Sequence, residues 1–209
     1  MSLTKNGALN LAVRDIIRFF AGQMKRLILF ASGAGSNAEN IMRFFAENPS
    51  VQVAAVFSNK ATAGVLNKAE KYGVETIVFS KDELNDGSVC AEVHKIKPDL
   101  IVLAGFLWKF PDDIIADFPN KIINIHPALL PKFGGKGMYG MNVHRAVQEN
   151  SETETGITIH YVDGHYDEGD IIFQHSVALD GTETCDEISS KVQQLEHQHL
   201  PEVIEKLLQ

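Results

Sequence analysis

The sequence has little cysteine and no long hydrophobic run. Its two cysteines, Cys90 and Cys185, lie far apart and form no Cys-x-x-Cys pair, which excludes a disulfide framework and a zinc knuckle. This cysteine usage fits a reducing compartment, so we expect a cytoplasmic protein. No apolar run reaches the roughly 18 residues that a membrane span needs, and no compact apolar block followed by small residues indicates a secretory signal. We therefore expect no membrane partner.

Positive charge is also scarce. The 209 residues include 19 Lys and Arg against 27 Asp and Glu, which leaves a formal net charge of -8. Because a nucleic-acid backbone attracts positive charge, this balance argues against nucleic acid as a partner. It leaves small molecules, with room for a local pocket that binds an anion. The remaining composition, 44% hydrophobic and 22% charged, is that of a folded globular protein rather than a disordered one.

The chain from residue 24 to residue 209 has the pattern of one α/β domain. Short apolar runs alternate with amphipathic stretches, which is typical of β-α-β units that build a parallel sheet. We expect a Rossmann-like fold, a mostly parallel open sheet flanked by helices. The expected strands are 26–31, 51–57, 75–79, 100–104 and 121–125, and the expected helices are 36–47, 64–72, 82–96 and 111–117. Ser36 and Asp82 are the expected N-caps of two of these helices.

The second half of the chain changes character, and a short segment precedes the domain. We expect a Pro- and Gly-rich loop at 127–140, a helix at 143–149, strands at 155–162 and 169–177, and a long helix at 185–208. Residues 1–23 place apolar side chains at helical spacing, so we expect a helical N-terminal extension. This extension is either a plain addition to the domain or an amphipathic docking helix.

A glycine-rich turn follows the first predicted strand. Gly33 and Gly35 precede a predicted helix, and Ala38 lies in its first turn. Backbone N–H groups at such a helix start can bind phosphate. The same spacing satisfies the dinucleotide-binding pattern, so a nicotinamide- or flavin-dependent oxidoreductase is an alternative. The second predicted strand, however, ends at 58–60 in Ser-Asn-Lys, without the acidic residue that an NAD site uses. A phosphate monoester is therefore favoured, with a tight turn that binds nothing as the other interpretation.

A second polar group stands at the end of the fifth predicted strand. Asn124 and His126 are two residues apart on an extended segment, so their side chains share one face. A converging amide and imidazole can hold a carbonyl oxygen, stabilise the negative charge that it gains under attack, and exchange protons near neutral pH. If the loop after 155–162 folds back, Asp167 can orient His126 and stabilise its cation. The alternative is that Asp167 only caps its own turn.

Together these motifs resemble one enzyme family. They are Gly-Ala-Gly-Ser-Asn after the first strand, Leu-Ala-Gly-Phe at 103–106, Asn-Ile-His-Pro-Ala-Leu-Leu-Pro from Asn124, and Thr-Ile-His-Tyr-Val with Asp167 downstream. The set is similar to that of the phosphoribosylglycinamide formyltransferases, the folate-dependent glycinamide ribonucleotide transformylases of the formyltransferase superfamily. The resemblance covers residues 24–209, and the Asn-x-His-Pro block with its distant Asp is the most specific part.

The resemblance implies a reaction and a set of site residues. In this family the formyl group of 10-formyltetrahydrofolate, a cosubstrate, moves to the amino group of glycinamide ribonucleotide in purine biosynthesis, without a metal. By resemblance, Asn124 and His126 are the catalytic residues that hold the formyl oxygen, and Asp167 keeps His126 protonated. The implied ribonucleotide contacts are Gly35, Ser36 and Asn37 for the phosphate, with Gln193 and Glu196 for the rest of the molecule.

The resemblance also implies where the folate lies. Its implied contacts are Leu107, Trp108, Lys109, Phe110, Asn124, Asp163, Gly164, His165, Tyr166 and Asp167. The chain departs from the family here, because relatives carry Met-Arg after Gly-Phe. The loop at 132–144 is longer than the usual Pro-Gly-Leu-His form. Its glycines and Lys136 lead us to expect a mobile flap that closes over the ribonucleotide, with a plain surface excursion as the alternative.

The other histidines give weaker signals. His197 and His199 lie two apart on a predicted helix, where their rings do not align, so the sequence gives no sign of a zinc site. His160 shares a strand face with Thr158, and we expect it to be structural or to support the site from outside.

Alternative functions stay open at this point. A formyltetrahydrofolate deformylase or another folate-dependent formyltransferase, such as the methionyl-transfer-RNA enzyme, carries a further domain that this length does not lead us to expect. More distant alternatives are a dinucleotide-dependent oxidoreductase and a nucleotide-binding module without activity. Such a module does not need Asn124, His126 and Asp167 together. We expect a monomer or a homodimer that acts on small molecules.

Overall fold

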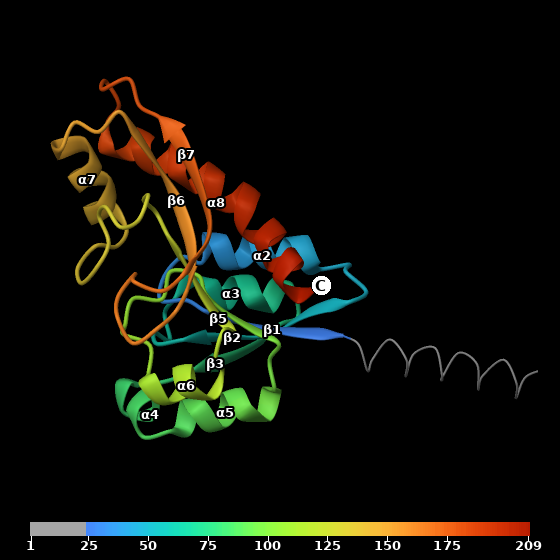
Figure 1. Cartoon of the computed structure of the whole chain (residues 1–209). Helices are drawn as coiled ribbons and strands as arrows, with labels where there is room; N and C mark the ends of the chain where they lie inside the picture. Colours follow the sequence, from blue (N-terminus) through green and yellow to red (C-terminus); the bar gives the residue numbers. More distant parts are fainter. Residues whose placement is uncertain (1–23) are drawn as a thin grey trace, which may run out of the picture.

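A seven-stranded sheet organises the part of the chain that the structure describes, residues 24–209 (Figure 1). The structure is a computed structural model, and the expected helical extension at 1–23 lies outside the described residues. The strands are β1 (Lys25–Phe30), β2 (Val51–Ser58), β3 (Glu75–Val78), β4 (Leu100–Leu103), β5 (Ile122–His126), β6 (Glu154–Tyr161) and β7 (Ile171–Ala178). Their order across the sheet is β3-β2-β1-β4-β5-β6-β7.

The first five strands are parallel, and β6 and β7 add to the sheet in antiparallel pairing. The predicted Rossmann-like, mostly parallel open sheet in one domain is thereby confirmed. From β1 the chain extends the sheet to one side through β2 and β3, and then crosses to β4 on the other side. Open α/β sheets bind ligands at the carboxyl ends of strands where the order reverses in this way. Here the backbone N–H of Ser32 donates to the carbonyl of Gly105 across that point, at 3.0 Å.

Helices cover both faces of the sheet because its strands are apolar on both faces. In β1, Leu27 and Leu29 pack into one core and Ile28 and Phe30 into the other, since successive strand side chains point to opposite sides. One face is covered by α2 (Ser36–Phe45), α3 (Gly64–Lys71) and α8 (Cys185–Leu208), and the other by α4 (Lys81–Asn85), α5 (Ser88–Ile96) and α6 (Asp112–Asp117) (Figure 1). The remaining helix, α7 (Met141–Glu149), packs against α8.

One predicted helix is wrong in form. Residues 82–96 fold as two short helices, α4 and α5, rather than one. Gly87 stands between them with φ of 88°, a left-handed conformation that interrupts an α-helix and that glycine adopts readily. The N-cap of α4 is Ser80 rather than Asp82, and Ser80 forms a capping box with Glu83.

The other predicted elements are found close to their expected bounds, and α8 has the expected bounds. This helix continues through Pro201, which is buried. Among residues 24–209, no helix combines the length and the apolar character that crossing a membrane requires.

Candidate active site

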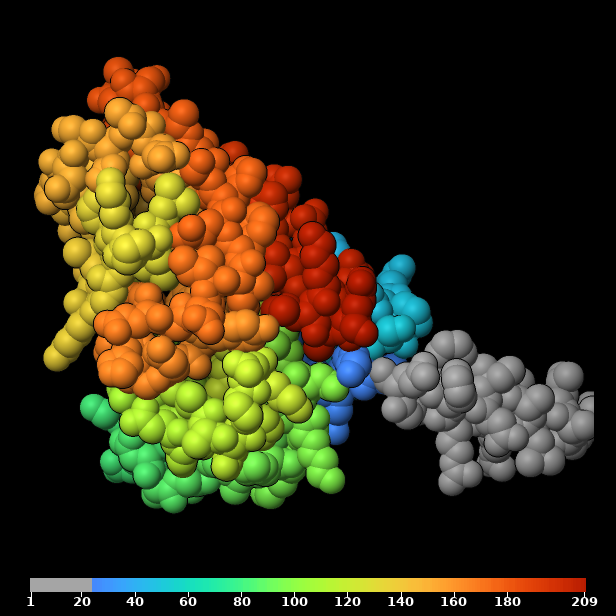
Figure 2. Space-filling view, in the orientation of Figure 1, coloured from blue at the N-terminus to red at the C-terminus, as the bar shows by residue number. Residues whose placement is uncertain are grey.

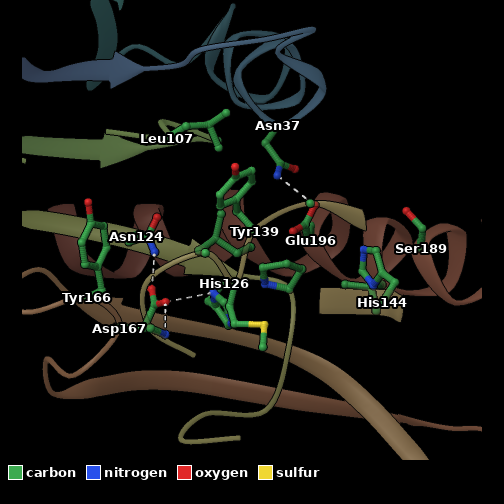
Figure 3. Close-up of a pocket in the computed structure, with 18 of the residues that line it drawn as sticks. Asn37, Leu107, Asn124, His126, Tyr139, His144, Tyr166, Asp167, Ser189 and Glu196 are labelled. Carbon is green, nitrogen blue, oxygen red and sulfur yellow. Dashed lines mark hydrogen bonds and ion pairs between the residues drawn. The ribbon is translucent and has the colours of Figure 1, made fainter. Parts of the chain in front are cut away.

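A cavity of about 570 Å³ lies where the chain leaves β1, β4 and β5. Its walls come from the start of α2, the loop after β5, α7, the β6–β7 connection and α8 (Figure 3). In the space-filling view, the loop after β5 (yellow) and the β6–β7 region (orange) adjoin on one face of the molecule (Figure 2). A cavity of this size suits a small organic ligand. The predicted site residues that line it are Asn37, Leu107, Asn124, His126, Tyr166, Asp167, Gln193 and Glu196.

The end of β5 presents Asn124 and His126 to this cavity, as their spacing predicts. In the pairing with β6, Asn124 stands opposite His160 and His126 opposite Thr158. The His126 side chain is buried, with 3% exposure. Its Nε2 lies 2.8 Å from the backbone carbonyl of Phe133. Because a carbonyl only accepts, Nε2 carries a proton, and Nδ1 is the nitrogen that can gain or lose one.

Asp167 is the third member of this group, and the β6–β7 loop does fold back to bring it there. One carboxylate oxygen, Oδ2, lies 3.5 Å from Nδ1 of His126 and accepts the backbone N–H of Gly135 at 2.9 Å. The other oxygen, Oδ1, lies 3.6 Å from Nε2 of His160 and accepts the side-chain amide of Asn124 at 3.4 Å (Figure 3). Asp167 thus contacts both of the other predicted catalytic residues, Asn124 and His126.

The charges of this group are set by burial and by mutual contact. Burial lowers the pKa of His126, and the Asp167 carboxylate and the Phe133 carbonyl oppose that effect. For Asp167 burial acts in the raising direction, but contact with His160, the charge of His126 and the Gly135 N–H outweigh it and lower the pKa. Asp167 is therefore an anion at neutral pH, held beside an imidazole whose proton is easily released.

His160 takes a more direct part than its strand position alone indicates. Its Nδ1 lies 2.8 Å from the Tyr161 carbonyl, which only accepts, so Nδ1 carries a proton and Nε2 is the ring nitrogen that faces Asn124. That nitrogen is 3.1 Å from the side-chain nitrogen of Asn124. His160 thereby fixes which way the Asn124 amide points. The second amide hydrogen of Asn124 makes only the long contact with Asp167, at 3.4 Å, so a substrate oxygen placed beside it can compete for that hydrogen.

The opposite end of the cavity joins the start of α2 to α8. Asn37 donates its side-chain N–H to Glu196 Oε2 at 2.9 Å, and Gln193 donates to the Ser36 hydroxyl at 3.2 Å. The residues predicted for the phosphate and those predicted for the rest of the ribonucleotide therefore meet. Burial raises the pKa of Glu196, and the Asn37 amide partly offsets the rise.

Gly35 shapes this end. It is the N-cap of α2, so the expectation that Ser36 is the cap is wrong, and Ser36 is the first helical residue. The φ of Gly35 is 70°, and a Cβ built on it would lie 2.5 Å from the Cβ of Val65. Only glycine fits this conformation beside Val65. Of the three residues expected to bind the phosphate, Asn37 lines the cavity, whereas Gly35 and Ser36 stand next to it in the chain and do not belong to the wall. The first N–H groups of α2 have no partner within the helix and so suit an anion.

The predicted folate contacts separate into two groups. Leu107 and Tyr166 line the cavity with Asn124 and Asp167. Trp108 and Phe110 instead pack with the core under α4, α5 and α6. Lys109 is exposed and pairs with Asp112 at 3.0 Å. Residues 163–165 form a turn outside the cavity wall, in which the Asp163 carboxylate accepts the N–H of His165 at 2.8 Å.

The glycine-rich loop after β5 forms one wall of the cavity. Residues 135–140 line it, including Lys136 and Tyr139. Gly135 and Gly137 have φ of 93° and 92°, values that favour glycine. Because the Gly135 N–H binds Asp167, the position of this loop is connected directly to the catalytic carboxylate.

Sequence reasoning missed some wall residues, of which His144 is the clearest. Its side chain is 4% exposed, lines the cavity from α7, and has an Nδ1 atom that finds no partner within residues 24–209. Burial lowers its pKa, and the nearby charge of His126 acts in the same direction. Ser189 and Val192 of α8 also belong to the wall. No local motif marks these residues, because their position depends on how α7 and α8 dock.

Known proteins share both sequence and fold with this chain. A profile described as formyl transferase matches residues 25–204. Phosphoribosylglycinamide formyltransferase of Bacillus subtilis is 34% identical over 191 residues, with 88% of this chain and 95% of that protein covered. The crystal structure of phosphoribosylglycinamide formyltransferase from Anaplasma phagocytophilum superposes with a TM-score of 0.81 at 32% identity, covering 88% of this chain and 87% of that one.

Plant relatives are longer than this chain. The chloroplastic phosphoribosylglycinamide formyltransferase of Vigna unguiculata is 40% identical over 189 residues, and that of Arabidopsis thaliana is 36% identical over 187 residues. The matches cover 88% and 86% of this chain. They cover 61% and 64% of the plant proteins, so this chain spans less than two thirds of their length.

Proposed function

The chain belongs to the formyl transferase family, and from this premise we propose that it transfers a formyl group from 10-formyltetrahydrofolate to the amino group of glycinamide ribonucleotide. This activity makes it a one-carbon transferase of purine biosynthesis, with the folate as cosubstrate and no metal in the reaction. The names of its relatives support the substrates. The observation that carries the proposal is that Asp167 contacts both Asn124 and His126 in the wall of a cavity that Asn37, at the start of α2, also lines.

The reaction replaces one C–N bond with another. The amine nitrogen of the ribonucleotide attacks the formyl carbon, a new C–N bond forms, and the formyl oxygen becomes negatively charged. Collapse of this tetrahedral intermediate breaks the bond between the formyl carbon and N10 of the folate. One proton leaves the attacking amine and one arrives at N10. The site therefore has to stabilise an oxyanion and move a proton at nearly the same point.

Asn124 and His126 suit these two tasks. The side-chain N–H of Asn124 and the protonated Nδ1 of His126 are the donors for the oxyanion. Asp167 stabilises the His126 cation, which burial alone disfavours. The burial that lowers the pKa of His126 also makes it a better proton donor to N10 of the folate, so one imidazole serves both stages.

The ribonucleotide fits the α2–α8 end of the cavity. The N–H groups at Gly35, Ser36 and Asn37 belong to a helix start, where they lack partners within the helix, and so suit its phosphate. Glu196 suits the ribose because a carboxylate can accept hydrogen bonds from two hydroxyl groups. Gln193 holds the start of α2 through its hydrogen bond to the Ser36 hydroxyl. Residues 135–140 of the flap line the cavity, Lys136 among them, and are then positioned to cover the ribonucleotide.

The folate suits the side of the cavity where Leu107 and Tyr166 stand. These side chains offer apolar contact for the pterin ring, close to Asn124 and Asp167. The other folate contacts, namely Trp108, Lys109, Phe110, Asp163, Gly164 and His165, remain predictions, and a role for them requires that the rim of the cavity close over the ligand.

The direct test mixes the purified protein with glycinamide ribonucleotide and a 10-formyl folate, and follows the absorbance change as the folate loses its formyl group. We expect consumption that requires both substrates, and a fall in kcat on the order of a hundredfold or more for His126→Ala. Equal consumption without the ribonucleotide would identify a deformylase instead. Saturable binding of a nicotinamide dinucleotide, or ribonucleotide binding without turnover, would favour the two more distant alternatives.

The cellular setting is part of the same proposal. Both cysteines in the described part of the chain are free, which supports a reducing compartment such as the cytoplasm. We propose small-molecule partners only, and a monomer or homodimer. Sedimentation of the purified chain and cell fractionation test these points.

A further inference from the structure

Three side chains with metal-binding chemistry converge between α5 and α6, and two of them, His94 and Asp117, are about half exposed. Cys90 and His94 are four residues apart on α5, so they lie on the same side of that helix. Asp117 is the last residue of α6. Its Oδ2 atom lies 3.6 Å from Cys90 Sγ and 2.8 Å from His94 Nε2. All three donor atoms lie within 4.8 Å of one another.

We propose that Cys90, His94 and Asp117 bind a divalent cation of the zinc class. Metal–ligand bonds of about 2.0 to 2.3 Å at tetrahedral angles place donor atoms roughly 3.3 to 3.6 Å apart. The sulfur and the carboxylate oxygen already have this separation, and the imidazole nitrogen has to move away from that oxygen by about half an ångström. The sulfur and the imidazole nitrogen lie within 4.8 Å of each other, so a turn of the His94 side chain has to set their separation as well. Thiolate and imidazole donors select zinc or cobalt over magnesium and calcium, and water completes the fourth position.

The surroundings hold two of the donors in place. Cys90 is 9% exposed, so its thiol has little freedom to leave the cluster. The His94 ring packs on Phe118, with ring centroids 5.0 Å apart. Asp113 adds negative charge near the thiol. When a cation binds, the sulfur–metal bond forms as the thiol proton leaves to solvent.

The proposed site is separate from the cavity. None of its three ligands belongs to the cavity wall, and α5 and α6 lie on the other side of the sheet from α2 and α8 (Figure 1). A bound cation connects α5 to α6 and so stabilises this layer. The proposal does not depend on formyl transfer. Residue spacing along the chain gives no sign of this metal site, because Asp117 is 23 residues from His94 and only the packing of the two helices brings them together.

The test uses the full chain without a histidine tag, reduced with a phosphine and freed of metal with a chelator. Cobalt(II) is added as the probe, because a cobalt–thiolate bond gives charge-transfer absorption in the near ultraviolet. We expect this band to saturate at one cobalt per chain, and zinc to remove it. We also expect zinc to raise the Tm by several degrees.

Variants decide which residues are responsible. Cys90→Ser should abolish the band and the zinc-dependent rise in Tm, while Cys185→Ser, which removes the other cysteine, should keep both. Asp117→Asn should weaken cobalt binding at least tenfold, and Asp113→Asn should change it far less. Circular dichroism confirms that each variant is folded. Absence of the band in the wild type at millimolar cobalt, or its persistence in Cys90→Ser, would overturn the proposal.

Discussion

At the scale of single residues, Asp167 is the point where the proposed machinery converges. Its two oxygens contact His126, His160, Asn124 and the flap amide of Gly135. Burial by itself would raise its pKa, and the effects of His160, His126 and the Gly135 N–H reverse the direction. The carboxylate is thus charged in a place where charge is costly, and its electrostatic effect on His126 is correspondingly strong.

Asp167→Asn is expected to lower kcat by a factor on the order of a hundred or more. It should also move the pH profile. Turnover that needs the His126 cation is present below the pKa of His126 and is lost as the pH rises through it. Asp167 opposes the lowering of that pKa by burial, so its removal lowers the pKa further, and the loss of turnover should begin at lower pH. An unchanged pH profile would contradict this role.

The matched control is Glu168→Gln, which removes the neighbouring, exposed carboxylate of the same loop. It should leave kcat and the pH profile close to those of the wild type. The pair separates the local effect of Asp167 from a general change in charge.

His160 acts through Asn124 and is a positioning residue. Replacing it with Phe removes the acceptor for the Asn124 amide, and we expect kcat to fall roughly tenfold to a hundredfold, because misplaced groups lose much of their effect. KM for the ribonucleotide should change little, since that end of the cavity is intact. His160→Gln restores an acceptor and should recover part of kcat. Equal losses in both variants, or a change confined to KM, would contradict positioning.

At the scale of elements, the start of α2 depends on one glycine. Gly35→Ala forces a side chain into a left-handed conformation and against Val65. We expect the free energy of unfolding, measured in urea, to fall by about 1 to 3 kcal/mol, and KM for the ribonucleotide to rise. Gly33→Ala is the control for stability, because no atom lies within 4 Å of its added Cβ. Equal free energies of unfolding for the two variants would show that Gly35→Ala introduces no strain.

The second prediction at the scale of elements concerns the flap. Lys136 belongs to the cavity wall, and Lys132, in the same loop, pairs with Glu152 at 2.9 Å away from it. Lys136→Ala should raise KM for the ribonucleotide severalfold, because a favourable contact with the phosphate is lost, whereas Lys132→Ala should not. Unaltered KM and kcat in Lys136→Ala would support a plain surface loop.

At the scale of the whole molecule, the sheet was predictable because its strands are buried on both faces. Apolar runs such as Leu27 to Phe30 leave little choice of structure, and the alternation with amphipathic helices fixes the class of fold. The division between α4 and α5 was not predictable from the same pattern. Apolar periodicity continues through the segment, and only the left-handed conformation of Gly87 reveals the interruption.

The candidate site likewise contains residues that the sequence predicts and residues that it does not. Strand periodicity predicts that Asn124 and His126 share one face. The position of Asp167 followed from the residues only on condition that its loop folds back, and the family resemblance supplied its place beside His126. The wall residues His144 and Ser189 were not predictable, because their position depends on how helices dock. Trp108 and Phe110 adjoin a motif in sequence yet pack in the core, since proximity along the chain does not set the direction of a side chain.

The central claim is that the formyl group passes from the folate to the amine of the ribonucleotide. The most direct measurement supplies 10-formyl folate with a carbon-13 formyl group, together with glycinamide ribonucleotide, and follows the label by NMR. We predict that the label appears as the formamide carbon of the ribonucleotide, with one equivalent formed for each folate consumed. Label appearing as free formate, or remaining on the folate with both substrates and active protein present, would contradict the account.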